Sequence, residues 1–484
     1  PEMEKVVVCR SSLIYFVEHR HLSYLFPQCS DLGDSELSLM FARCELELRR
    51  SLEVRCRMKL GQGGCRRWGG VLVARGQGDS LPASVVWSPE LLKYKHSQDH
   101  PMSPHRLALT MSLATSLGVL DGVEILAPGE ATEQDLLRIH AIRYVDAVKS
   151  ASTMEPGEHS GLPHGLGTAD NPTFPHMHEA SAAIAGSTLT AAREVASGRM
   201  KRAISVAGGM HHAMRNAAAG FCVYNDCAIA IHWLLEQGFK KIAYVDVDVH
   251  HGDGVQAAFY DDPRVMTVSL HQHPATLWPM TGWSSEIGDG ASEGTVVNLP
   301  LLPGTTDSQW MRGFHAIVPG ALRAFEPEII VLQGGCDSHR EDMIADLSLT
   351  VDGHRASYRE VRALADELCD GRIIAVGGGG YELTRVVPRS WTHLIATMLD
   401  RDVPTDTEIP TQWRDLAAEV APPSKVPTTM GDGGDTSFSR WELGPGAAVA
   451  MADDRSMARL DQAILDTRRA AFPPLGLDPD DPRD

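Results

Sequence analysis

Short apolar runs alternate with stretches of helical periodicity along the middle of the chain. The runs are rich in valine and isoleucine and predict buried strands at residues 203–209 (AISVAGG), 242–249 (IAYVDVDV), 264–270 (RVMTVSL), 328–335 (EIIVLQGG) and 372–380 (RIIAVGGGG). Between them, stretches such as MHEASAAIAGSTLTAAREVASG predict helices, this one closed by Gly198. Alternation of strands and helices predicts an α/β fold with a parallel sheet covered by helices on both faces.

The same pattern divides the chain into three segments. The alternation of strands and helices occupies residues 84–400. Residues 1–80 hold five of the nine cysteines and have no clean period, so we expect a poorly ordered extension; a small cysteine-based metal module is the alternative. Residues 401–484 are rich in proline, glycine and aspartate and predict a tail with little core of its own and one short helix, ARLDQAILDTRRAAF.

Composition excludes some classes of function. The net charge of -19 argues against a protein that binds nucleic acid by neutralising phosphates, although the N-terminal segment is rich in arginine. No run of about 18 apolar residues is present, so we expect no membrane span. The cysteines show no CxxC spacing and the N-terminus has no signal-peptide pattern, which favours a reduced, cytoplasmic protein.

Candidate chemistry begins in the stretch YVDVDVHHGDG. Asp246, Asp248 and His250 alternate, so in a strand they would share one face near its carboxyl end, where open α/β sheets place their sites. An aspartate that caps the next loop would explain one carboxylate but not the whole set, so we predict a metal site. Asp337 follows the run 328–335 and is the candidate third ligand, completing a site with one open position; alone, it could equally cap a helix.

Two more strand ends carry polar side chains. His211 and His212 follow the run 203–209 and would suit proton transfer if carboxylates such as Asp246 and Asp253 orient them; solvent-facing loop histidines are the alternative. Tyr381 follows four glycines and could donate to a developing oxyanion. These glycines lack the spacing of phosphate-binding loops.

Five motifs in order, GGMHHAM, GFCVYND, DVDVHHGDG, GGCDSH and GGGGY, resemble the zinc-dependent histone deacetylase family, in particular its bacterial acetoin-utilization (AcuC-type) branch. The resemblance runs from about Val85 to Asp400 and includes HPMSPHRLALT near its start. It implies the arginase/deacetylase fold, with a single eight-stranded parallel sheet and helices on both faces. It also implies a protein lysine deacetylase that hydrolyses Nε-acetyl-lysine to lysine and acetate, in acetoin and acetate metabolism.

The resemblance also implies roles for individual residues. It makes Zn²⁺, with Fe²⁺ as the alternative, the catalytic ion held by Asp248, His250 and Asp337. The implied catalytic residues are the general base His212, oriented by Asp253, then His211 paired with Asp246, and the oxyanion donor Tyr381. The implied substrate-binding residues are Asp170, Gly220, Phe221, Trp278 and Gly379. A structural K⁺ is implied at Asp246, Asp248, His250, Ser269 and Leu270. Trp278 departs from the family, which usually has phenylalanine there.

Four alternatives for the function stay open from the sequence. An amidohydrolase of acetylated polyamines or other small amides would have the same site. An arginase-like ureohydrolase would need two manganese ions and more carboxylate ligands. A reader of acyl-lysine would bind without turnover, and DNA binding would depend on the arginine-rich N-terminus. The expected partner is an acetylated protein or peptide, with an acetyl-CoA synthetase as the example from the family and with no nucleic acid or membrane.

Overall fold

The computed structural model divides into two compact units, residues 1–79 and residues 80–484. It describes residues 83–97, 99–154, 162–442 and 455–484, and the backbone of two antiparallel hairpins in the first unit. These hairpins pair β1 (Lys5–Arg10) with β2 (Leu13–Glu18) and β3 (Arg66–Trp68) with β4 (Val71–Val73). For residues 1–80 we expected a poorly ordered extension or, as the alternative, a cysteine-based metal module. Both predictions fall on side chains and segments outside the described residues, so both stay predictions.

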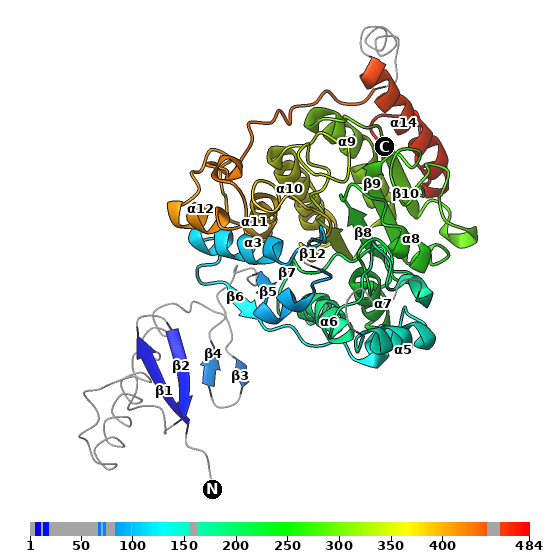
Figure 1. Ribbon diagram of the computed structural model, residues 1–484. Helices are drawn as coiled ribbons and strands as arrows, with labels where there is room; N and C mark the ends of the chain where they lie inside the picture. The colour runs from blue at the N-terminus through cyan, green and yellow to red at the C-terminus, as the bar shows by residue number, and fades with distance from the viewer. Residues whose placement is uncertain are drawn as a thin grey trace, which may run out of the picture. The chain divides into compact units, whose positions relative to one another are not determined.

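The second unit is built around one eight-stranded sheet in the order β10-β9-β8-β11-β12-β7-β5-β6 (Figure 1). Every neighbouring pair in it is parallel. The strands are β5 (Ser84–Val86), β6 (Glu124–Leu126), β7 (Arg202–Ser205), β8 (Ile242–Asp246), β9 (Val265–Gln272), β10 (Val296–Leu301), β11 (Ile329–Gln333) and β12 (Ile373–Val376). The predicted α/β fold with a single eight-stranded parallel sheet is therefore confirmed.

The five apolar runs form β7, β8, β9, β11 and β12. The other three strands of the sheet were not predicted, and the reasons differ. β5 and β6 are only three residues long, too short for a periodic signal, and β10 (VVNLPL) is interrupted by Asn298 and Pro300. Every residue of β8, β9, β11 and β12 is buried, as expected for strands covered on both faces.

Helices pack in two layers, one on each face of the sheet. One layer contains α3, α9, α10 and α11, and the other contains α5, α6, α7 and α8 (Figure 1). The helices are α3 (His105–Ser116), α4 (Glu133–Leu136), α5 (Ile142–Ala151), α6 (Met177–Ala196), α7 (Asp226–Glu236), α8 (Asp253–Phe259), α9 (Asp307–Phe325), α10 (Val351–Leu368), α11 (Val387–Met398), α12 (Thr411–Ala417) and α14 (Arg455–Ala471). Among these, none has the length and apolar character needed to cross a bilayer.

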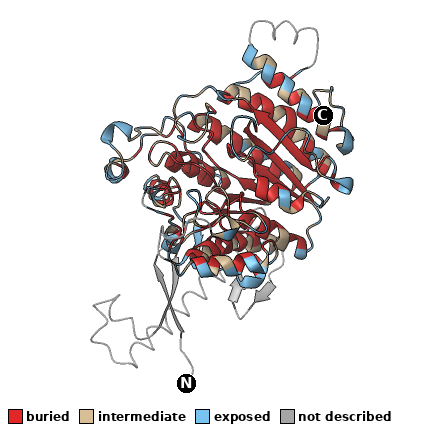
Figure 2. Cartoon of the chain, turned by 45° about the vertical axis from the view of Figure 1, so that its right-hand side comes forward, coloured by how far each residue is buried: buried red, intermediate tan, exposed pale blue. Residues whose placement is uncertain are grey.

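The described residues beyond 401 contribute large side chains to the core. Trp413 of α12 is buried, and its indole N–H donates to the carbonyl of Leu109 on α3 at 2.9 Å. Helix α14 packs against α9 and β10, and its Asp461 forms a buried ion pair with Arg312 at 2.7 Å. In Figure 2 the buried residues fill the sheet and the inward-facing sides of the helices. These contacts join the C-terminal segment to the sheet unit.

Replacement of Trp413 tests this connection. We expect Trp413→Ala to lower the free energy of unfolding by about 3–5 kcal/mol, because it leaves a cavity between α12 and α3. The matched control is Leu416→Ala on the same helix, an exposed position where a change of about 0.5 kcal/mol or less is expected. Urea denaturation followed by circular dichroism would measure both. Equal destabilisation by the two variants would contradict the buried position of Trp413.

Candidate active site

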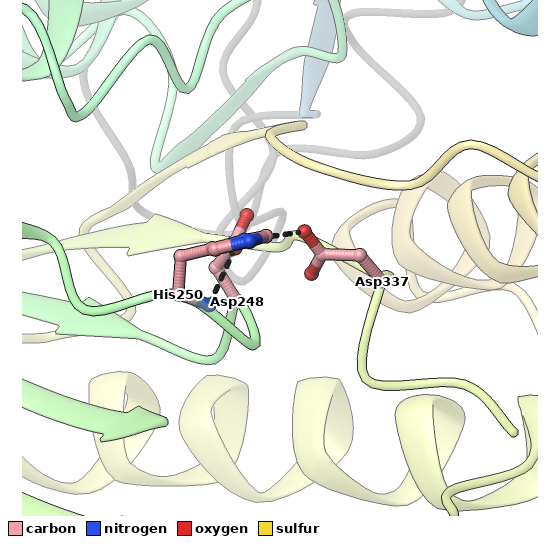
Figure 3. A group of neighbouring side chains, drawn as sticks. All are labelled: Asp248, His250 and Asp337. Carbon is pink, nitrogen blue, oxygen red and sulfur yellow. Dashed lines mark hydrogen bonds and ion pairs between the residues drawn. The ribbon is translucent and has the colours of Figure 1, made fainter. Parts of the chain in front are cut away.

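Asp248, His250 and Asp337 form a buried group in which each residue offers one ligand atom, all within 4.8 Å of one another. The Nδ1 atom of His250 lies 3.2 Å from Asp248 Oδ1 and 3.0 Å from Asp337 Oδ2 (Figure 3). Atoms that share one ion at bond lengths of about 2.0–2.1 Å stand roughly 3.3 Å apart. The spacing and the donor types therefore fit a divalent metal ion with three protein ligands and one open position.

The charges of the group support the same conclusion. One imidazole Nδ1 faces two carboxylates, and a single N–H cannot satisfy both of them equally. Burial and the neighbouring Asp248 carboxylate raise the pKa of Asp337 to about 6, whereas the effect of burial on Asp248 is outweighed by His211, His250 and Gln333, which hold its pKa well below the usual value. A divalent cation bound by the group would add positive charge beside both carboxylates.

The triad converges through turns in the loop after β8. The sequence predicts a strand through Val249, but β8 ends at Asp246. The next ladder bonds are replaced by side-chain acceptors: the Asp248 N–H donates to Asp246 Oδ1 at 3.1 Å, and the His250 N–H donates to Asp248 Oδ1 at 3.0 Å. The Val249 N–H donates to Asp337 Oδ1 at 2.9 Å, which connects this loop to the third ligand. Strand alternation is thus not what brings the ligands together.

Neighbouring residues hold the Asp248 carboxylate from outside the triad. Its Oδ2 atom accepts from the side-chain amide of Gln333 at 2.8 Å and from the N–H of Gly379 at 2.7 Å. A Cβ atom on Gly379 would collide with Asp337, and one on Gly335 with Asp248, so only glycine permits this approach. The structure therefore places Gly379 beside the ligands. Gln333 was not predicted; its only signal is a polar residue at the end of an apolar strand.

The histidine pair lies beside the triad after β7. His211 Nδ1 lies 2.7 Å from Asp246 Oδ2, and His212 Nδ1 lies 2.7 Å from Asp253 Oδ1. The two rings are 4.0 Å apart between centroids, and both side chains are buried, so the solvent-facing alternative is wrong. An Nδ1–H that donates to a carboxylate leaves Nε2 free to exchange a proton. Tyr244, which was not predicted, donates its hydroxyl to Asp246 Oδ2 at 2.7 Å.

The two histidines differ in charge. Burial lowers the pKa of His211, but the carboxylates of Asp246 and Asp248 outweigh burial and raise that pKa to about 9. Burial and the positive charge of His211 lower the pKa of His212 well below its usual value. At neutral pH, His212 is therefore the neutral member of the pair and the one whose Nε2 can accept a proton.

Tyr381 lies in the loop after β12 and is buried. Its N–H donates to Asp342 Oδ2 at 2.8 Å, and burial, together with Asp337 and Asp248, raises the pKa of its hydroxyl well above the usual value. The hydroxyl therefore remains a proton donor. Arg106 supports the loop, because its Nη1 atom donates to the carbonyls of Gly378 and Gly380 at 2.9 and 3.1 Å. Arg106 was not predicted, although it lies within the motif HPMSPHRLALT.

Three of the implied substrate-binding residues, Gly220, Phe221 and Trp278, lie near His212 or Tyr381. A Cβ atom on Gly220 would lie 2.5 Å from His212 Cδ2 and 2.7 Å from Trp278 Cη2, so these three residues are in contact. Gly220 also has a φ of +50°, which a side chain disfavours. The rings of Phe221 and Tyr381 are 5.6 Å apart between centroids. Gly220 therefore lies close to both His212 and Trp278, and Phe221 lies close to Tyr381.

Asp170 and Ser269 occupy different positions around the site. Asp170 is exposed, and its backbone carbonyl lies 3.2 Å from His100 Nε2. Ser269 pairs with Asp246 in the register of β9 and β8, and its hydroxyl lies 2.8 Å from His271 Nδ1. Because His271 Nε2 faces the carbonyl of Gly282 at 2.9 Å and donates to it, the Ser269 hydroxyl donates to Nδ1 of His271 and its oxygen keeps its lone pairs. Leu270 is the next residue on β9 and is buried.

Comparison with known proteins decides the family. Residues 100–398 match the model of the histone deacetylase domain. The chain belongs to the histone deacetylase family. It is 38% identical over 328 residues to the acetoin utilization protein AcuC of Bacillus subtilis, covering 68% of this chain and 84% of that protein. It is 36% identical over 342 residues to AcuC of Staphylococcus aureus, covering 70% and 88%.

Solved structures of the same family have this fold. The crystal structure of a histone deacetylase homologue from Aquifex aeolicus matches with a TM-score of 0.66 and 28% identity, over 78% of this chain and all of that one. A homologue complexed with SAHA matches with a TM-score of 0.67, again at 28% identity and with the same coverage. The arginase/deacetylase architecture implied by the motifs is therefore confirmed, and the buried triad is the metal-site candidate of a histone deacetylase domain.

Replacement of one ligand tests the triad directly. We expect the wild-type chain, reconstituted with Zn²⁺ and desalted, to retain one ion per chain in atomic emission measurements. Asp337→Asn removes an anionic ligand and is expected to lower the retained metal at least about tenfold, in line with the loss of a ligand from a three-ligand site. Asp346→Asn, an exposed position in the same connection, is the control. Equal metal content in both variants would contradict the site.

Proposed function

We propose that this protein is a metal-dependent protein lysine deacetylase, which hydrolyses Nε-acetyl-lysine to lysine and acetate. The observation that carries the proposal is the buried triad beside two His–Asp pairs and Tyr381, in a chain of the histone deacetylase family. Asp248, His250 and Asp337 would hold Zn²⁺, with Fe²⁺ as the alternative. When bound, the ion supplies Lewis-acid chemistry, which polarises the amide carbonyl and lowers the pKa of water.

His212 acts as the general base in this proposal. Its Nδ1–H is committed to Asp253 at 2.7 Å, so Nε2 takes the proton of the attacking water. The imidazolium then returns a proton to the nitrogen of the leaving amine, and the C–N bond breaks. Asp246 holds His211 in the same way and keeps a positive charge beside the reacting carbonyl. General acid–base catalysis by a positioned side chain typically raises the reaction rate about 10²–10⁴-fold.

Tyr381 stabilises the oxyanion that forms when water adds to the carbonyl. Its hydroxyl stays protonated because the side chain is buried and close to the ligand carboxylates. Two sets of hydrogen bonds support its placement. The Tyr381 N–H donates to the Asp342 carboxylate, and the Arg106 guanidinium donates to the carbonyls of Gly378 and Gly380. A donor fixed in advance does not have to reorganise during the reaction.

The proposed K⁺ site lies behind the metal ligands. Asp246, Asp248, His250, Ser269 and Leu270 would hold the ion. Support comes from the register that pairs Asp246 with Ser269 and from the Ser269 oxygen, which retains lone pairs while its hydrogen is bonded to His271. Oxygen atoms of this kind suit a hard monovalent cation. The cation would steady the loop that carries two ligands.

The proposed passage for the substrate leads to His212 and Tyr381. Gly220, Phe221 and Trp278 would line it, and Gly379 would lie at its base beside the ligands. A glycine at position 220 leaves room beside His212 that a larger side chain would fill, which suits a slender, unbranched chain such as a lysine side chain. Asp170, exposed at the entrance, would accept from the substrate backbone. The indole of Trp278, larger than the usual phenylalanine, makes the passage tighter.

The relatives support a role in acetoin and acetate metabolism, because those of B. subtilis and S. aureus are named acetoin utilization proteins. An acetylated enzyme such as an acetyl-CoA synthetase is the proposed partner. An acetylpolyamine or small-amide hydrolase is the second candidate, since its site would be the same. An arginase-like reaction has less support, because two bridged manganese ions would need more carboxylate ligands than the group of Asp248, His250 and Asp337 in the described residues offers.

The direct test is deacetylation by the zinc-loaded full chain. We expect release of acetate from an acetyl-lysine peptide, measured by coupled assay and mass spectrometry, and inhibition by a hydroxamate chelator of the kind exemplified by SAHA, which a homologue binds. A zinc-loaded, folded chain that releases no acetate from peptides or from N-acetylputrescine would overturn the proposal. Turnover of N-acetylputrescine alone would favour the second candidate.

Removal of one hydroxyl tests the role of Tyr381. Tyr381→Phe is expected to lower kcat by about 10²–10³-fold, the loss typical of one oxyanion donor, while KM and zinc content change little. Steady-state kinetics on an acetyl-lysine peptide would measure this. Tyr260→Phe, at the end of α8, is the matched control and should behave as wild type. Full turnover by Tyr381→Phe with normal zinc content would refute the assigned role.

A further inference from the structure

Asp432 lies in the C-terminal segment, outside the residues that match the histone deacetylase domain. Its side chain is only 4% exposed. The Asp432 N–H donates to Asp352 Oδ2 on α10 at 2.7 Å, and the neighbouring carbonyl of Gly431 accepts from Arg389 Nη1 on α11 at 3.0 Å. The backbone around Asp432 is therefore fixed against two helices that pack on the sheet.

The Asp432 carboxylate binds donors from three separate segments. Its Oδ1 accepts from Arg389 Nη2 at 2.7 Å. Its Oδ2 accepts from the N–H of Val351 at 3.0 Å and faces His339 Nε2 at 2.9 Å. Because His339 Nδ1 accepts from the N–H of Glu341 at 3.0 Å, the ring proton is on Nε2 and is donated to Asp432. Burial would raise the pKa of Asp432, but the bond from His339 and the charge of Arg389 hold this pKa well below its usual value, so the carboxylate stays charged.

His339 connects Asp432 to the loop that carries Tyr381. The backbone carbonyl of His339 accepts from the N–H of Asp342 at 2.9 Å. The Asp342 carboxylate in turn accepts from the N–H of Tyr381 at 2.8 Å. A displacement of His339 would therefore move the acceptor that holds the Tyr381 backbone.

Arg389 connects Asp432 to the same loop from the other side. Its Nε donates to the carbonyl of Arg385, four residues after Tyr381. The Nε atom of Arg385 lies 3.0 Å from Glu341 Oε2, in an ion pair that leads back to the loop after β11. The interactions therefore form a closed ring that joins Asp432, the loop after β11, the loop after β12 and the start of α11.

We propose that Asp432 is a positioning residue for the oxyanion donor Tyr381. This inference rests on the proposed function, in which Tyr381 stabilises the oxyanion. A catalytic group must be held within about 0.5 Å of its productive position by residues that are themselves fixed by packing and hydrogen bonds. Asp432 does not contact the reacting atoms. It holds His339 and Arg389 and, through them, both loops that fix Tyr381.

A role in folding alone is the alternative, because removal of one partner from any buried ion pair is destabilising. Asp461 provides a matched control for that role. It is also buried, lies in the same C-terminal segment and pairs with a buried arginine, Arg312 on α9, at 2.7 Å. The Nη1 atom of Arg312 donates to the carbonyls of Ser439 and Arg440, which lead away from the Tyr381 loop.

The test compares Asp432→Asn with Asp461→Asn in the zinc-loaded full chain. We expect Asp432→Asn to lower kcat on an acetyl-lysine peptide by about 10–100-fold, the loss typical of an outer supporting residue, with little change in KM. Zinc content should stay at the wild-type value, because Asp337 is also held by His250 and by the Val249 N–H. Asp461→Asn should unfold at a lower temperature but keep the wild-type kcat.

Hydrogen exchange gives a readout that does not depend on turnover. Measured by mass spectrometry on the zinc-loaded chain without substrate, Asp432→Asn should speed amide exchange in residues 338–346 and 381–386, because the ring that holds these segments is opened. Asp461→Asn should leave exchange in both segments unchanged.

Combination with Tyr381→Phe separates positioning from destabilisation. If Asp432 acts through the Tyr381 hydroxyl, Asp432→Asn should lower kcat by no more than about twofold once that hydroxyl is absent, whereas independent effects would multiply. His339→Asn is a second variant should Asp432→Asn fail to fold. Asparagine keeps an acceptor for the Glu341 N–H but is too short to reach Asp432, so we expect a lower kcat and the same lack of multiplication.

The outcomes separate this inference from the proposed function. A wild-type kcat in folded, zinc-loaded Asp432→Asn overturns the positioning role and leaves the deacetylase standing. Multiplied effects in the combined variant, or an equal loss of kcat in Asp461→Asn, also overturn it. No turnover by the zinc-loaded wild type overturns both proposals. A loss of kcat that is confined to the Asp432 and His339 variants, and that nearly vanishes with Tyr381→Phe, supports the positioning role.

Discussion

The structure depends on two buried carboxylates that must share one positive charge. Asp248 and Asp337 are fully inaccessible to solvent, and only the imidazole of His250 stands between them. Burial of each charge costs several kcal/mol unless a counter-charge and hydrogen bonds compensate it. The neighbouring residues act accordingly: Gln333 and the Gly379 N–H bind Asp248, and glycines allow the backbone to approach. A bound cation would supply the further positive charge that offsets the free-energy cost of burying both carboxylates.

The sheet order explains how distant segments meet at this point. β8, β11, β12 and β7 are consecutive neighbours in the sheet. Their carboxyl ends deliver, in turn, Asp248 with His250, then Asp337, Tyr381, and the pair His211–His212. Parallel strands end at the same edge, so four loops converge there without any long-range distortion of the core.

Much of the fold and of the candidate site was predictable from the sequence. Fully buried central strands appear as apolar runs. Asp337, two residues beyond the run 328–335, became a candidate ligand because it agrees with Asp248 and His250. Other features leave no such trace. The turns after Asp246 depend on side-chain acceptors, and the support from Arg106 and Gln333 depends on contacts across the sheet.

Three side chains from two neighbouring strand ends would together bind one divalent ion. A crystal structure of the zinc-loaded chain, with data collected on both sides of the zinc absorption edge, tests this most directly. We expect one anomalous peak at an ion that is bonded to the Asp248 and Asp337 carboxylates and to His250 Nδ1, at bond lengths of about 2.0–2.2 Å. Density at this position without an anomalous peak, or an Asp337 side chain turned away from the other two, would contradict it.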